Sequence, residues 1–61
     1  MPIIRVEMFE GRTADQKREL VEVLTRESCR ILGCTPQDVH VVIDNRAKEN
    51  WGIAGKLASE K

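Results

Sequence analysis

The sequence contains 61 residues, of which 41% are hydrophobic and 33% are charged, so we expect a single small domain spanning residues 1–61. Ten basic and ten acidic residues cancel, which argues against a polyanion such as nucleic acid as a partner. The apolar stretches are far shorter than the roughly 20 residues that a membrane-spanning helix needs. The early charges of Arg5 and Glu7 interrupt any secretory signal. We therefore expect a cytoplasmic protein that binds neither nucleic acid nor membrane.

The small size of the chain limits its hydrophobic core. A chain of about 60 residues buries only about 60% of the surface that its unfolded state exposes. Cys29 and Cys34 are the only cysteines and His40 is the only histidine, so no zinc-ligand set is present and we expect neither a metal nor another cofactor. Two free thiols are favoured over one short-loop disulfide. We therefore expect several copies of the chain to associate.

Residues 2–9 alternate in polarity with the period of two that is typical of a β-strand. One face of this strand is apolar and the other is mixed: Pro2, Ile4, Val6 and Met8 lie opposite Ile3, Arg5, Glu7 and Phe9.

A long amphipathic helix is predicted after the turn at residues 10–12. Thr13 and Gln16 have the spacing of a capping box, and Gly33 stands where a left-handed residue ends a helix. Between these ends, apolar residues repeat with the helical period on one side. This stripe consists of Leu20, Leu24 and Ile31, flanked by Val21, Val23, Ser28 and Leu32.

The second half of the chain predicts a turn, a strand and a hairpin. Residues 35–38 form a short capped turn with Pro36 at its first helical position, and residues 39–44 alternate as a strand. Strand, helix and strand in this order predict an α/β (α+β) fold with parallel strands. In residues 46–61, Gly52 and Gly55 favour a hairpin or tight bend, which we expect to pack on a neighbouring chain.

Pro2 is the candidate with the most distinctive chemistry. If Met1 is removed, Pro2 becomes an N-terminal secondary amine, and burial or nearby cations lower the pKa of an amine. Because Pro2 shares the apolar face of its strand, a neutral amine there would be a general base that needs no histidine. Taken alone, a Met-Pro start more often only begins a strand.

Arg12 and Trp51 each allow two interpretations. Arg12, at the strand-to-helix turn, is either solvated or paired with Glu10, or it binds a carboxylate with its planar guanidinium. Trp51, one of two aromatic residues in the chain, is either a packing anchor in a subunit interface or a wall of an active site.

Together these features resemble the 4-oxalocrotonate tautomerase family, whose members are chains of about this length. The resemblance implies a β-α-β unit with a C-terminal hairpin, dimers with a four-stranded sheet, and a hexamer built from dimers. It extends over nearly the whole chain: Met1-Pro2-Ile3, Glu10-Gly11-Arg12-Thr13 with Asp15-Gln16-Lys17, the helix, the strand from Val39 to Ile43, and Trp51-Gly52-Ile53-Ala54-Gly55.

The resemblance implies an isomerase of aromatic-hydrocarbon catabolism whose general base is Pro2. In this reading, the amine takes the 2-hydroxyl proton of a dienol such as 2-hydroxymuconate and delivers a proton to C5. Arg12 binds the remote carboxylate of the substrate and draws electron density toward it. Trp51, where the family usually has phenylalanine, keeps the pocket apolar. The implied partners are a small anionic enol or keto acid and further copies of the chain.

His40 departs from the family pattern, which commonly has a second arginine at this position, supplied by another subunit, against the 2-oxygen and C1 carboxylate. A neutral imidazole offers neither a permanent charge nor a planar fork of donors. An unperturbed imidazole becomes a cation only below about pH 6.5, and Arg46 is the alternative cation. We therefore expect tautomerase activity that is reduced or directed to a related enol.

Two other functions remain open at this stage. A hydratase or dehalogenase of unsaturated acids in the same superfamily would use the same amine to activate water. A catalytically silent oligomeric homologue is the other alternative, and retention of Met1 would favour it because Pro2 would then be an internal amide.

Overall fold

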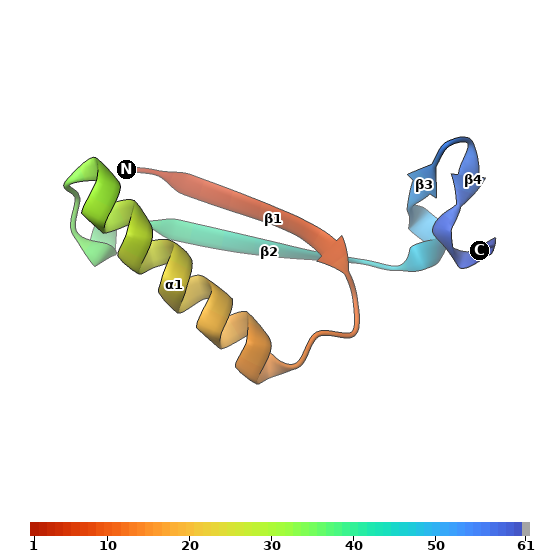
Figure 1. Ribbon diagram of the computed structural model, residues 1–61, viewed down its shortest axis with the longest axis horizontal. Coiled ribbons are helices and arrows are strands. Elements are labelled where there is room, and N and C mark those ends of the chain that lie inside the picture. The colour runs from red at the N-terminus through yellow and green to blue at the C-terminus, as the bar shows by residue number, and fades with distance from the viewer. Residues whose placement is uncertain (61) are drawn as a thin grey trace.

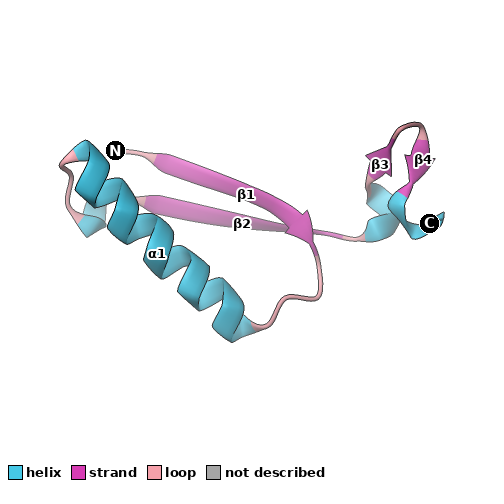
Figure 2. Ribbon diagram, in the orientation of Figure 1, coloured by secondary structure: helices cyan, strands magenta, loops and turns pink. Residues whose placement is uncertain are grey.

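The structure, a computed structural model, describes residues 1–60, and Lys61 at the end of the predicted domain and tail lies outside the described residues. A β-α-β unit is followed by a separate C-terminal arm (Figure 1). The main elements are β1 (Ile3–Phe9), α1 (Ala14–Leu32), β2 (His40–Arg46), β3 (Gly52–Ile53) and β4 (Lys56–Leu57). Three short 3-10 helices, drawn in the same colour as α1 in Figure 2, span Pro36–Asp38, Lys48–Asn50 and Ala58–Glu60.

The two long strands are parallel, as the sequence predicts. Ile3 pairs with His40 at one end of the ladder, and Phe9 pairs with Arg46 at the other. β2 begins one residue later and ends two residues later than the predicted strand 39–44, because its pairing with β1 continues as far as Arg46. The turn predicted at residues 35–38 is present as the 3-10 helix Pro36–Asp38.

Both predicted ends of the long helix are confirmed. The Gln16 N–H donates to Thr13 Oγ1 at 3.1 Å and the Thr13 N–H donates to Gln16 Oε1 at 3.0 Å, which completes the capping box. Gly33 adopts a left-handed conformation with φ of 70°, and its N–H donates to the Cys29 carbonyl at 2.9 Å. These caps satisfy backbone groups that a helix otherwise leaves without partners.

The capping box provides a direct test of local stability. We expect Thr13→Ala to lower the free energy of unfolding by about 1 kcal/mol, because the Gln16 N–H loses its acceptor. Urea unfolding at a fixed protein concentration measures this change. Thr25→Ala, inside α1, is the matched control and should not destabilise the protein, because alanine has the higher helix propensity. Equal unfolding midpoints for Thr13→Ala and the unchanged protein would contradict the role of the cap.

α1 covers one face of the two-stranded sheet (Figure 1). The predicted alternation along β1 is confirmed, because Ile4, Val6 and Met8 are half-buried under the helix while Ile3, Arg5 and Glu7 are exposed. The sheet does not cover the whole apolar stripe of α1, because Ile31 and Leu32 in its last turn are 67% and 62% exposed in the single chain.

The chain on its own lacks a closed core. None of residues 1–60 is fully buried, and the radius of gyration is 14.5 Å, whereas a compact domain of this length has a value of about 10 Å. A fold that leaves every apolar side chain partly in contact with water cannot offset the entropy cost of ordering the chain. The structure therefore requires further protein surface for its stability.

The C-terminal segment forms the predicted hairpin. β3 and β4 are antiparallel, with Gly52 opposite Leu57, and the turn between them contains Gly55 with φ of 82°. This arm projects away from the β-α-β unit (Figure 1), and its apolar residues Ile53 and Leu57 are each about 40% exposed (42% and 41%). Its packing on a neighbouring chain stays a prediction. Across residues 1–60, α1 included, no helix has the length and apolar character needed to cross a membrane.

Candidate active site

Pro2 and His40 lie at the same end of the sheet. The His40 N–H donates to the Pro2 carbonyl at 3.0 Å, so the start of β2 holds the residue that precedes β1. Pro2 is half-buried and His40 is exposed. Because His40 pairs with Ile3 and side chains alternate along a strand, the imidazole lies on the face opposite to that of the Pro2 ring.

Arg12 lies beyond the other end of β1, in the loop that leads to α1. Its side chain takes part in none of the ion pairs found among residues 1–60, so the pairing with Glu10 that the sequence allows is not observed. Arg12 and Lys17 instead line a cavity of about 210 Å³, together with Met8, Gln16 and Leu20. Two cations beside apolar walls can hold a small organic anion. Lys17 was not singled out from the sequence, where it resembles any exposed charge of the helix.

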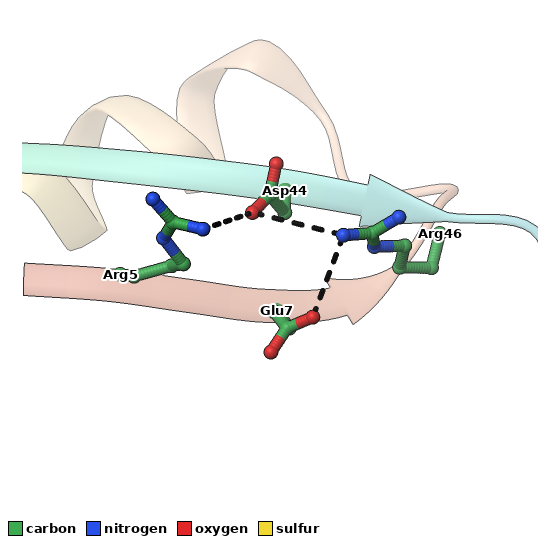
Figure 3. Close-up of polar contacts among 4 residues, drawn as sticks. All are labelled: Arg5, Glu7, Asp44 and Arg46. Atoms are coloured by element: carbon green, nitrogen blue, oxygen red, sulfur yellow. Dashed lines mark ion pairs between the residues drawn. The ribbon is translucent and has the colours of Figure 1, made fainter.

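Arg46 belongs to a cluster of four charged residues across β1 and β2 (Figure 3). Its guanidinium lies 3.6 Å from Glu7 and 4.0 Å from Asp44, and Arg5 lies 3.9 Å from the same Asp44 oxygen. Partly exposed pairs of this kind contribute little to stability, but they hold the Arg46 guanidinium against Glu7 and Asp44. Arg46 also lies at the end of β2 away from His40, which argues against it as a replacement for the missing second arginine within one chain.

Trp51 connects the C-terminal arm to the end of β1. Its ring packs edge to face on Phe9, with centroids 4.6 Å apart and an interplanar angle of 63°, and the Lys48 ammonium lies 5.7 Å from the centre of the Phe9 ring. Phe9 was predicted only as an outward-facing strand residue. Its pairing with Trp51 depends on the path of the arm, which no local sequence signal predicts.

The candidate residues therefore form two groups at opposite ends of one strand pair. Pro2 and His40 lie at one end, and Arg12, Arg46 and Trp51 lie at or beyond the other. A strand rises about 3.3 Å per residue, so the seven residues of β1 separate Pro2 from Arg12 by about 20 Å or more. A single small acid cannot contact both residues of the same chain.

The two cysteines have free thiols, as predicted. Burial raises the pKa of the Cys29 thiol, and the neighbouring Cys34 thiol and the Asp38 charge raise it further. Among residues 1–60, no three His, Cys, Asp or Glu side chains gather in a way that could hold a metal ion.

Comparison with known proteins identifies the family. Residues 2–61 match the family model described as Tautomerase enzyme. A probable tautomerase of Halalkalibacterium halodurans is 39% identical over 61 residues, covering 100% of both chains. The 2-hydroxymuconate tautomerase of Comamonas testosteroni is 42% identical over 60 residues, covering 98% of this chain and 95% of the relative.

Two solved structures show the same fold. A structure from a study of the 4-oxalocrotonate tautomerase isozymes of Methylibium petroleiphilum superposes with a TM-score of 0.93 at 36% identity, covering 97% of this chain and 92% of the other. A heterohexamer 4-oxalocrotonate tautomerase of Chloroflexus aurantiacus superposes with a TM-score of 0.91 at 27% identity, covering 98% and 97%. Sequence and fold agree over nearly the full length, and the chain belongs to the tautomerase family.

Proposed function

We propose that this protein is a tautomerase that interconverts the enol and keto forms of an unsaturated 2-hydroxy or 2-oxo dicarboxylate such as 2-hydroxymuconate. The position of Pro2 carries the proposal: it is half-buried at the start of β1 and held there through the His40 N–H. The 2-hydroxymuconate tautomerase of Comamonas testosteroni supports this choice of substrate class.

In the proposed reaction, removal of Met1 frees the nitrogen of Pro2 as a secondary amine. The amine accepts the proton of the 2-hydroxyl group, and the electron pair of that O–H bond forms the C2 carbonyl. The two double bonds shift toward the remote carboxylate, and the ammonium returns its proton to C5. The partly buried position of Pro2 supports this role, because desolvation favours the neutral form of an amine.

The site is complete only when two copies combine. If two chains join their sheets about a twofold axis, the strands of the two copies run antiparallel, so the start of one pair lies beside the end of the other. This arrangement would bring Arg12 and Trp51 of the partner subunit to the Pro2 end. Arg12 of the partner subunit would bind the remote carboxylate and stabilise the negative charge that moves toward it. Trp51 of the partner subunit would exclude water.

Further association of such dimers into a hexamer completes the proposal. The absence of any fully buried residue among residues 1–60 supports it, as do the exposed apolar residues of the projecting arm. The heterohexamer of Chloroflexus aurantiacus supports the same number of subunits.

The enol-to-keto conversion tests the proposal most simply. Ketonisation of 2-hydroxymuconate is followed by ultraviolet absorbance with protein whose intact mass shows the loss of Met1. We expect the rate to rise in proportion to the protein added. No acceleration by protein that has lost Met1 would overturn the proposal. Halide release from a halogenated unsaturated acid, without ketonisation, would favour the dehalogenase alternative.

His40 provides a separate test of the substrate-binding end. We expect His40→Arg to raise kcat/KM about ten- to a hundredfold, because a charged hydrogen bond from this position of a neighbouring subunit to the C1 side of the substrate is worth about 1.5–3 kcal/mol. The gain should appear with both 2-hydroxymuconate and its monoacid analogue, since both retain the C1 carboxylate. His40→Gln, which stays neutral, is the matched control. Equal kinetics for His40→Arg and the unchanged protein would place His40 outside the site.

A further inference from the structure

Two thiols lie near the C-terminal end of α1, Cys29 within the helix and Cys34 two residues after it. Gly33 ends the helix in a left-handed conformation, with its N–H bound to the Cys29 carbonyl at 2.9 Å. This bond folds the turn that follows the helix back onto Cys29, and Cys34 is the next residue after the glycine. The Cys34 Sγ lies 3.9 Å from the Ser28 carbonyl oxygen, so its side chain does turn onto the last helical turn.

Both thiols are half-buried and unoxidised in this structure, and the proposed reaction uses neither. Burial raises the pKa of Cys29, and the neighbouring Cys34 thiol raises it further. Because the thiolate is the attacking form, the raised pKa makes Cys29 a poorer nucleophile than an ordinary thiol.

We propose that Cys29 and Cys34 form a redox-responsive dithiol that a low-molecular-weight disulfide, such as glutathione disulfide, converts into an intramolecular disulfide. The Cys34 thiolate attacks one sulfur of the small disulfide, forming a mixed disulfide and releasing one thiolate. Cys29 then loses its proton and attacks the Cys34 sulfur, which releases the second thiolate. Two protein thiols are oxidised and one small disulfide is reduced to two thiols.

A short segment, braced by local hydrogen bonds, runs from Cys34 to the proposed active site. Thr35, next to Cys34, bonds to the Asp38 carboxylate through its hydroxyl at 3.2 Å. The 3-10 helix that contains Asp38 is closed by the Val39 N–H on the Pro36 carbonyl at 3.2 Å, and the next residue, His40, donates to the Pro2 carbonyl. Closing the disulfide would pull on the segment that positions the Pro2 end of the sheet. This regulatory role rests on the proposed function.

Alkylation and intact mass test the chemistry without an activity assay. The whole reduced protein is equilibrated with mixtures of reduced and oxidised glutathione, treated with iodoacetamide and weighed. We expect oxidising mixtures to give one species with no alkylated cysteine and with two hydrogen atoms fewer. Cys29→Ser should trap a glutathione adduct at Cys34, whereas Cys34→Ser should react more slowly. Two alkylated thiols in every mixture, a glutathione adduct of the unchanged protein alone, or a disulfide between chains would overturn the proposal.

Activity then tests the regulatory role. We expect the disulfide form to turn over 2-hydroxymuconate on the order of tenfold more slowly, since misplacing a catalytic group by about 1 Å can cost about a hundredfold. The double variant Cys29→Ser/Cys34→Ser should keep the same rate in reducing and oxidising mixtures. Equal rates for the reduced and disulfide forms would overturn the regulatory role. Absence of turnover in both forms would contradict the proposed function. The mass measurement would still show whether Cys29 and Cys34 form the intramolecular disulfide.

Discussion

Pro2→Ala is expected to lower kcat for 2-hydroxymuconate by about a hundredfold or more, within the range of about 100- to 10,000-fold that a positioned general base contributes. Alanine retains an N-terminal amine after removal of Met1, but this amine is primary and lacks the ring that holds the nitrogen in a fixed orientation. Some activity should therefore remain. Stopped-flow or steady-state ultraviolet assays of ketonisation measure the loss.

Two controls make this expectation specific to the amine. Pro36→Ala changes the only other proline and keeps the backbone carbonyl that caps the 3-10 helix, so it should leave the rate nearly unchanged. Protein in which Met1 is retained should lose more activity than Pro2→Ala, because Pro2 is then an amide without a basic nitrogen. Equal rates for Pro2→Ala and the unchanged protein would exclude the amine as the base.

Arg12→Ala is expected to damage turnover of the diacid selectively. Loss of a charged contact costs about 1.5–3 kcal/mol, so kcat/KM for 2-hydroxymuconate should fall about ten- to a hundredfold. The monoacid analogue lacks the remote carboxylate, and its kcat/KM should change little. Comparing the two substrates therefore separates a binding role of Arg12 from a structural one.

Arg18→Ala is the matched control for this loss of charge. Arg18 forms an ion pair with Asp15 on the exposed surface of α1, so its removal should affect neither substrate. If Arg12→Ala lowered turnover of the diacid and the monoacid equally, Arg12 would have no role in binding the remote carboxylate.

Local signals in the sequence predict most of the fold. The capping box of Thr13 and Gln16 and the left-handed Gly33 mark the helix ends because the groups that satisfy each end are near in sequence. The alternation of residues 2–9 predicts β1 and its buried face for the same reason. The periodicity of the helix does not show which of its apolar residues the sheet covers, and Ile31 and Leu32 belong to the stripe but are exposed in the single chain.

The candidate site is less accessible to sequence reasoning, since its parts meet only through tertiary or quaternary contacts. Their chemistry and position made Pro2 and Arg12 candidates and the resemblance to the family strengthened both, but periodicity alone could not show that about 20 Å separates them in one chain. The ion pairs that occupy Arg46 and the contact of Trp51 with Phe9 join residues far apart in sequence. The length of the sequence did indicate that one chain has too small a hydrophobic core. The structure confirms this, because none of residues 1–60 is fully buried.

A mixture of two impaired variants tests most directly whether Pro2 and Arg12 of different chains form one active site. Pro2→Ala and Arg12→Ala chains are unfolded together in equal amounts, refolded, and assayed with 2-hydroxymuconate. In a twofold dimer of one chain of each kind, one of the two sites has both residues intact. Random pairing should therefore restore about a quarter of the activity of the unchanged protein. Activity no higher than the mean of the two variants refolded separately would contradict a site shared between subunits.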